Sequence, residues 1–213
     1  VAVWDRLKNS VKENSRFFTN MDEFAQYEYL TAGKSLHIGQ KLYRSRVTPI
    51  GQKKIKWDKM GCPPKELTTA GRANPIGIPY LYLSDSAKTT YFEVRAVYLD
   101  KLSVGTFRIE KDLKLIDFVY DVNLFLSYND GSVPLKETII KKKVIEAISS
   151  DLSKPLRRYD SEIEYVPTQL ICEYCRRIVD SEGATADGIT FESSLHKGGR
   201  NYVLFDESAA KCI

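Results

Sequence analysis

The order of hydrophobic and polar residues predicts several short strands. From Tyr80 to Ser84, aromatic or polar residues alternate with leucine, so Tyr80, Tyr82 and Ser84 share one face and Leu81 and Leu83 share the other. A period of two residues is typical of a β-strand whose faces meet different surroundings. Strands are also predicted in five other segments: residues 39–48, 104–110, 113–118, 187–191 and 201–205.

Other segments have the period of an amphipathic helix. Within residues 134–152, apolar side chains fall near one stripe: Leu135, Ile139, Val144, Ile148 and Leu152. A second helix begins at Pro167, a residue that suits the first turn of a helix. A third and shorter helix follows Ser84 and Asp85, either of which is a plausible N-cap.

The remaining segments define the domain organisation that we expect. Residues 1–35 are predicted to be helical and amphipathic but irregular, and we interpret them as a packing arm or as the end of an upstream domain. Residues 36–213 form the main domain. Residues 49–79, which are rich in proline and glycine, are predicted to form a long loop of the kind that tends to be functional. Residues 128–132 predict a turn, and residues 155–166 predict a loop.

The composition is ordinary for a globular protein. The chain has 213 residues and a formal net charge of +4, and its basic residues form no single long run, so we expect no direct contact with nucleic acid. No apolar run approaches the length of a membrane span, and the polar start does not resemble a signal peptide. The chain begins with Val1, so we interpret it as a fragment or a processed form. The four cysteines favour a reducing cytosol over a disulfide framework, which predicts a cytoplasmic protein.

Residues 71–95 bring together side chains that suit a nucleotide site. Arg72 and Asn74 stand in a stiff loop of glycine and proline, Tyr82 lies on the strand that follows, and Glu93 lies on the next helix. Arginine binds phosphate, an aromatic ring stacks on a base or a sugar, and a carboxylate binds ribose or moves a proton. The alternative is a surface arginine, a core tyrosine and a helical glutamate in an ordinary ion pair.

Two arginines share one face of the strand at residues 39–48. Arg44 and Arg46 alternate with Tyr43 and Ser45, and two buried guanidinium groups are costly unless an anion or a carboxylate meets them. One interpretation of these positions is therefore an anion site that involves Arg44 and Arg46. The alternative is an exposed edge strand with solvated arginines.

Three separated motifs resemble the RES domain, a family named for its arginine, glutamate and serine. The run GRANPIGIPYLYLSD, followed by Glu93, is similar to its most specific signature, and LYRSR resembles the element that carries the arginine, here Arg44. The run DGITFES resembles the third element, which places the serine at Ser193 with Ser194 beside it. The run GGRN is similar to a turn of the family, and Asn201 is expected to help frame the pocket.

The resemblance implies a fold and an active site. RES domains resemble ADP-ribosyltransferases, which implies a mixed α/β (α+β) domain with a split, largely antiparallel sheet and flanking helices. NAD would be the substrate, and no cofactor or metal is expected beside it. Glu93 would stabilise the cation that develops as the nicotinamide–ribose bond breaks, and Tyr82 would stack on the nicotinamide or the ribose. Arg44 and Arg72 would hold the pyrophosphate, with Arg46 as a supporting cation, and Ser193 would bind the ribose or a phosphate.

The resemblance also implies a function. It predicts an NAD glycohydrolase or phosphorylase that acts as a bacterial toxin or a defence effector. A protein ADP-ribosyltransferase that uses the same site and a non-catalytic nucleotide sensor remain as alternatives. Candidate partners besides NAD are an antitoxin protein, an upstream regulatory domain and a second copy of the chain.

Two further features suggest chemistry only weakly. Cys172 and Cys175 form a CxxC pair inside a predicted helix, but no second pair lies at ligand spacing, so a buried structural pair is favoured over a metal or redox site. His196 stands alone in a glycine-rich loop, where a polar surface role is more common than that of a general base. We therefore leave all three residues outside the predicted site.

Overall fold

The computed structural model describes residues 2–26, 30, 32–119, 134–154, 162–178 and 183–213. The predicted turn at residues 128–132 and most of the predicted loop at 155–166 lie outside these ranges. The strands are β1 (Ala32–Leu36), β2 (Lys41–Val47), β3 (Leu81–Ser84), β4 (Leu102–Ile109), β5 (Leu113–Asp117), β6 (Gly188–Glu192), β7 (Arg200–Leu204) and β8 (Ala210–Cys212). The α-helices are α1 (Ala2–Asn9), α2 (Asp22–Gln26), α3 (Ala87–Glu93), α5 (Leu135–Ser153) and α6 (Val166–Cys175). A π-helical turn (Ser10–Asn14) extends α1, and short 3-10 turns lie at Trp57–Lys59, Lys65–Leu67, Glu162–Tyr165 and Glu207–Ala209.

The described strands form one eight-stranded sheet in the order β1-β5-β6-β7-β3-β2-β4-β8. Neighbouring strands are antiparallel except for β5 and β6, which are parallel. The predicted mixed α/β class with a largely antiparallel sheet is therefore confirmed.

The sheet is split between β2 and β3. These two strands pair only at Tyr43 and Ser84, whereas β2 pairs with β4 along its whole length, from Lys41 opposite Arg108 to Val47. Because the backbones separate beside this single pair, side chains from both strands and from α3 reach the space between them.

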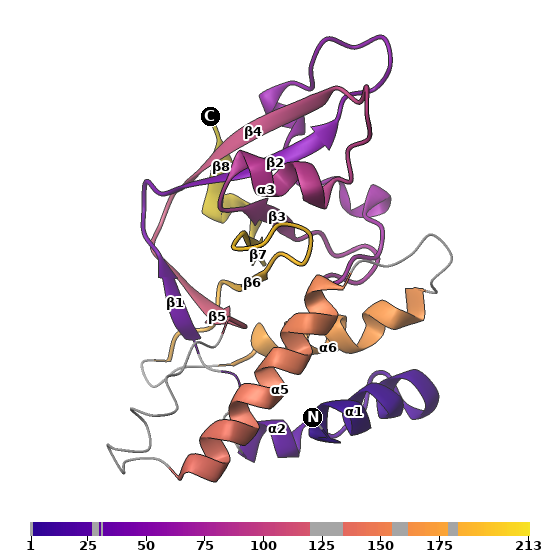
Figure 1. Cartoon of the computed structure of the whole chain (residues 1–213), viewed down its shortest axis with the longest axis vertical. Helices are drawn as coiled ribbons and strands as arrows, with labels where there is room; N and C mark the ends of the chain where they lie inside the picture. Colours follow the sequence, from indigo (N-terminus) through magenta and orange to yellow (C-terminus); the bar gives the residue numbers. More distant parts are fainter. Residues whose placement is uncertain (1, 27–29, 31, 120–133, 155–161, 179–182) are drawn as a thin grey trace.

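Helices cover one face of the sheet in two layers. Helix α5 lies between the sheet and the N-terminal helices α1 and α2, and α6 lies beside it (Figure 1). This side holds the larger apolar cluster, whose fully buried side chains include Trp4, Ile148, Ile171, Ile189 and Val203. A second cluster packs on the opposite face and contains Leu42, Leu81, Leu83, Phe107 and Leu204. Among the described helices, none combines the length and apolar character needed to span a bilayer.

The N-terminal segment differs in part from the prediction. Residues 2–14 and 22–26 are helical as expected, and Trp4 and Leu7 pack into the larger core, as a packing arm would. However, Ala32–Leu36 forms strand β1 and pairs with β5, so the helical prediction for residues 1–35 is wrong there. The pairing edge of β5 supplies the hydrogen bonds that favour a strand, and no local pattern signals it. The division of the chain after residue 35 stays a prediction.

Smaller differences concern where elements begin and end. Ser86 caps α3, because its hydroxyl accepts a hydrogen bond from the Thr89 amide, so the predicted caps at Ser84 and Asp85 are wrong. Helix α6 begins with Pro167 in its first turn as predicted. Strand β8, which the sequence did not predict, pairs with β4. The other predicted strands are all present, and residues 49–79 form a loop with two short 3-10 turns.

Two isoleucines on α5 test the packing of this helix. Ile148 is completely buried, whereas Ile140 is 37% exposed. We expect Ile148→Ala to lower the free energy of unfolding by about 2–5 kcal/mol, because it removes packed methyl groups and leaves a cavity. Ile140→Ala, the same change on the same helix, should cost less than about 1 kcal/mol. Urea unfolding monitored by circular dichroism measures both, and equal losses would contradict the placement of α5.

Candidate active site

A cleft of about 310 Å³ opens where β2 and β3 separate. Of the residues predicted for the site, five line it: Arg44, Arg72, Tyr82, Glu93 and Asn201. The aromatic rings of Tyr43 and Phe191 also contribute to its wall. The cleft thus combines cationic, aromatic and acidic groups from segments far apart in the sequence.

Glu93 is the acidic group of the cleft, and its carboxylate is held by two neutral donors. It is the last residue of α3, a helix that Ser86 fixes at its other end. Its Oε1 atom accepts hydrogen bonds from Ser193 Oγ at 2.6 Å and from Asn201 Nδ2 at 2.8 Å. Its Oε2 atom has no hydrogen-bond partner among the described residues. One carboxylate oxygen is therefore committed to the protein, while the other remains available to a ligand.

Ser193 follows β6, and its hydroxyl is fully engaged. It donates to Glu93 and accepts hydrogen bonds from the backbone amides of Leu195 at 3.3 Å and His196 at 3.1 Å. The prediction gave Ser193 a contact with ribose or phosphate. In this structure the hydroxyl instead orients the carboxylate of Glu93.

His196 fastens the loop between β6 and β7, residues 193–199 and here called the serine loop, to α3. Its Nδ1 atom lies 2.9 Å from Thr89 Oγ1, and its ring stacks on Phe92 with ring centroids 5.2 Å apart. The Thr89 hydroxyl itself donates to Asp85, so His196 Nδ1 is the donor in their contact. Gly199 lies so close that a Cβ atom there would approach Thr89 and His196 to within 3 Å. The contacts of His196 are thus those of a structural residue.

Asn201 extends the network into the sheet. Its Oδ1 atom accepts a hydrogen bond from Ser84 Oγ at 2.8 Å, while its amide group donates to Glu93. Ser84 and Asn201 are directly opposed on β3 and β7, and both are buried. The local sequence favours Ser84 as a helix cap, and this prediction misses its hydrogen bond to Asn201. Its place on the same strand face as Tyr82 was the signal that could have indicated it.

The arginine loop, residues 71–75, is shaped by a close approach at Gly71. A Cβ atom at this position would lie 2.4 Å from Asn74 Oδ1 and 2.8 Å from Tyr82 Oη, so only glycine fits. The Tyr82 hydroxyl donates to Asn74 Oδ1 at 2.7 Å and accepts from the Ala73 amide at 3.0 Å. Asn74 uses its amide within the loop, on the carbonyls of Thr69 and Pro75. Asn74 therefore shapes the arginine loop and is not among the residues that line the cleft.

Arg72 enters the cleft from this loop. Its Nη1 atom donates to the Leu152 carbonyl at 2.7 Å, at the C-terminal end of α5. Burial lowers the pKa of the Arg72 guanidinium, while the Glu93 carboxylate acts on it in the opposite direction. The cation and the carboxylate therefore interact within one cleft, as the sequence predicted.

Helix α6 holds the backbone of the arginine loop. Thr168 Oγ1 donates to the Arg72 carbonyl at 2.7 Å, and Gln169 Nε2 donates to the carbonyls of Gly71 at 2.8 Å and Asn74 at 3.0 Å. The sequence analysis did not select Thr168 or Gln169. Nothing in their local sequence indicates these contacts, because their partners lie more than 90 residues away.

Arg44 and Arg46 form a separate basic cluster at the border of the cleft. Among the residues that the structure describes, Arg44 Nη1 and Arg46 Nε are buried without a hydrogen-bond partner, and Arg46 Nη2 donates to the Gly61 carbonyl at 2.5 Å. Burial and the neighbouring Arg46 lower the pKa of Arg44. Burial and the Glu207 carboxylate raise the pKa of the nearby Cys62 thiol to about 11, so this thiol is neutral at pH 7. The structure brings Arg44 to the cleft, but it does not bring Arg46 there.

Ser194 and the CxxC pair lie away from the cleft. Ser194 Oγ donates to the Ser153 carbonyl at 2.5 Å and thereby ties the serine loop to α5. Cys172 and Cys175 are fully buried in α6 as free thiols, and burial raises the pKa of both. Thiols in this state are poor nucleophiles and poor metal ligands.

Comparison with known protein families identifies the chain. The family model described as RES domain matches residues 41–213. This chain belongs to the RES domain family. No curated protein and no solved structure matches it significantly. The matched region thus begins at β2 and contains every residue that lines the cleft, as well as Ser193.

Tyr82 tests how the arginine loop of this RES domain is held. Tyr82→Phe keeps the ring but leaves the Ala73 amide and Asn74 Oδ1 without their partner. Because unsatisfied buried polar groups are costly, we expect the free energy of unfolding to fall by about 1–3 kcal/mol. Tyr98→Phe is the matched control, since Tyr98 is 92% exposed and should show no change. Urea denaturation compares the variants, and an unaltered midpoint for Tyr82→Phe would refute this account of the loop.

Proposed function

We propose that this RES domain degrades NAD by cleaving the bond between nicotinamide and ribose. The observation that carries the proposal is the carboxylate of Glu93, held through Oε1 by Ser193 and Asn201 beside Arg72. Membership of the RES domain family supports it, since NAD-consuming activity is associated with this family. NAD is the substrate, and the proposed reaction uses no additional cofactor.

Glu93 would act on the charge that develops at the sugar. As the bond between ribose C1 and the nicotinamide nitrogen breaks, its electron pair leaves with nicotinamide and the ribose becomes cation-like. A fixed carboxylate stabilises such a cation without reorganising during the reaction. The Oε2 atom, which has no hydrogen-bond partner among the described residues, would accept a hydrogen bond from a ribose hydroxyl. This bond would set the distance between the carboxylate and the sugar. Ser193 contributes by keeping the carboxylate in this orientation.

The other residues of the cleft would bind the substrate. A volume of about 310 Å³ is at the lower end of the usual range for ligand pockets, so it suits the nicotinamide riboside end of NAD better than the whole molecule. Tyr82 would pack on the nicotinamide or the ribose with its ring, because its hydroxyl is already committed to the arginine loop. Arg72 and Arg44 would attract the pyrophosphate as it leaves the cleft.

The second step would consume the ribosyl cation. Water that adds to C1 and loses a proton yields ADP-ribose, whereas inorganic phosphate yields a phosphorylated ADP-ribose. As a toxin or defence effector, such an enzyme would act in the cytoplasm, where an antitoxin protein would restrain it. These features of the proposal rest on family membership.

A substitution at Glu93 tests the proposed chemistry. Glu93→Gln keeps the size of the side chain and one accepting oxygen but removes its charge, so turnover of NAD should fall by about 100-fold or more. The matched control is Glu192→Gln, which makes the same change at an exposed glutamate one residue before Ser193. Nicotinamide release measures turnover, and thermal denaturation checks that both variants fold. A fully active Glu93→Gln enzyme would exclude the proposed role.

The products identify the reaction. Purified protein is incubated with NAD labelled in its adenylate half, with and without phosphate, and small molecules and protein are then separated. We expect free nicotinamide together with labelled ADP-ribose or its phosphorylated form. Label that stays on protein would indicate an ADP-ribosyltransferase, and intact bound NAD would indicate a sensor; either result would overturn the proposal.

A further inference from the structure

The C-terminal end of α5 contacts the arginine loop through Arg72 and the serine loop through Ser194. The Leu152 carbonyl accepts the hydrogen bond from Arg72, and the Ser153 carbonyl accepts the one from Ser194. Ser153 Oγ also donates to the Glu192 carbonyl at 2.6 Å. The last four carbonyls of a helix have no partner within the helix, so they are free to bind donors from elsewhere. Their partial negative charge also favours a cation such as Arg72.

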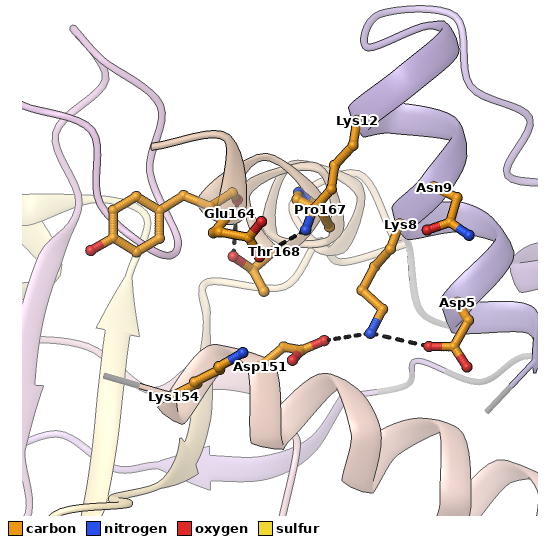
Figure 2. Close-up of a pocket in the computed structure, with 10 residues that line it drawn as sticks. Asp5, Lys8, Asn9, Lys12, Asp151, Lys154, Glu164, Pro167 and Thr168 are labelled. Carbon is orange, nitrogen blue, oxygen red and sulfur yellow. Dashed lines mark hydrogen bonds and ion pairs between the residues drawn. The ribbon is translucent and has the colours of Figure 1, made fainter. Parts of the chain in front are cut away.

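The same turn of α5 is attached to the N-terminal helix. Asp151 accepts hydrogen bonds from Trp4 Nε1 at 2.7 Å and from Lys8 Nζ at 3.1 Å. Figure 2 shows Lys8 of α1 lying between Asp151 and Asp5, with a dashed contact to each. The residue beside Leu152 is thus anchored to a segment that precedes the matched family domain.

A second ion pair connects the N-terminal segment to α6. Lys12 Nζ lies 2.7 Å from Glu164 Oε2, in the 3-10 turn that leads directly into α6. The first turn of α6 contains Thr168, whose hydroxyl holds the Arg72 carbonyl. The Lys12–Glu164 pair therefore fixes the element that holds the backbone of Arg72, and the Lys8–Asp151 pair fixes the element that holds its side chain.

These two ion pairs, here called the brace, border a polar cleft of about 420 Å³ between α1, the end of α5 and the start of α6 (Figure 2). The side chains of Lys8 and Asp151 are only 27% and 28% exposed. The ion pair Arg6–Glu23 joins α1 to α2, and its side chains are 63% and 42% exposed. Water screens a partly buried pair less than an exposed one, so the Lys8–Asp151 pair contributes more to stability than the Arg6–Glu23 pair.

We propose that the N-terminal helix positions Arg72 for substrate binding through the brace, with Asp151 and Glu164 as positioning residues. Both ion pairs act on Arg72, because its side chain is hydrogen-bonded to α5 and its backbone to α6. The consequence for activity rests on the proposed function, because it requires Arg72 to bind the substrate. The expected effect on the order of the arginine loop does not rest on the proposed function, because it concerns the protein alone.

The first test combines Lys8→Met with Lys12→Met, which removes both positive charges of the brace and keeps long apolar side chains. Arg6→Met is the matched control on the same helix. Hydrogen–deuterium exchange of residues 70–76 should become at least about threefold faster in the double variant and stay unchanged in the control, because local opening sets exchange rates. Strand β4, residues 102–109, serves as the internal reference and should not change. Unchanged exchange at residues 70–76, or equal acceleration throughout the chain, would overturn the proposal.

Kinetics separate positioning from a general loss of structure. If Arg72 binds the substrate, the double variant should raise KM for NAD about tenfold with a smaller change in kcat, whereas partial unfolding would lower kcat alone. Failure of the wild-type protein to turn over NAD would refute the proposed function, and the exchange experiment would still decide the brace. NAD turnover therefore tests the proposed function, and hydrogen exchange tests the brace.

A charge reversal of the Lys12–Glu164 pair provides the final control. Lys12 and Glu164 pair only with each other among the described residues, so Lys12→Glu and Glu164→Lys should each accelerate exchange at residues 70–76. The combination of the two restores an ion pair and should return exchange towards the wild-type rate. Additive effects without rescue would contradict a role for the ion pair.

Discussion

Two hydrogen bonds to one carboxylate oxygen join three separate parts of the RES domain. Glu93 ends α3, Ser193 follows β6 and Asn201 lies on β7, and all three meet at Glu93 Oε1. An unpaired buried polar group costs about 1–3 kcal/mol, so each of these groups constrains the others. The carboxylate is therefore oriented by the protein before any substrate arrives, and its second oxygen has no hydrogen-bond partner in the described part of the chain.

The cleft around this carboxylate depends on the incomplete pairing of the sheet. Strands β2 and β3 meet at a single residue pair, and the loop that precedes β3 carries Arg72 into the opening. Gly71 allows that loop to pack against Tyr82 without a steric clash. The free carbonyls at the end of α5 and the polar side chains of α6 then hold the loop from outside. Local geometry and distant helix ends are thus both needed to place one guanidinium.

Strands with a clear alternation were predictable. The pattern of Leu81 and Leu83 against Tyr82 and Ser84 identified β3 and its two faces, because each face has a different environment over the whole strand. Strand β1 carries no such pattern. It is stabilised by its pairing with β5, which the local sequence does not reveal. Ser86 replaced the two expected caps because the Ser84 hydroxyl is used inside the sheet. Such errors arise where a long-range contact outweighs a local preference.

The family, the mixed α/β class and the types of residue at the site could all be predicted from the amino-acid sequence. Its motifs placed Arg44, Arg72, Tyr82, Glu93 and Asn201, which all reach one cleft. The packing of the folded chain was needed to show that Arg46 and Asn74 face other parts of the protein, and that Ser193 is bound to Glu93. The physical reason is that spacing along the chain fixes the relative directions of neighbouring side chains but does not reveal partners a hundred residues away. Those partners are chosen when the sheet, α5 and α6 pack together.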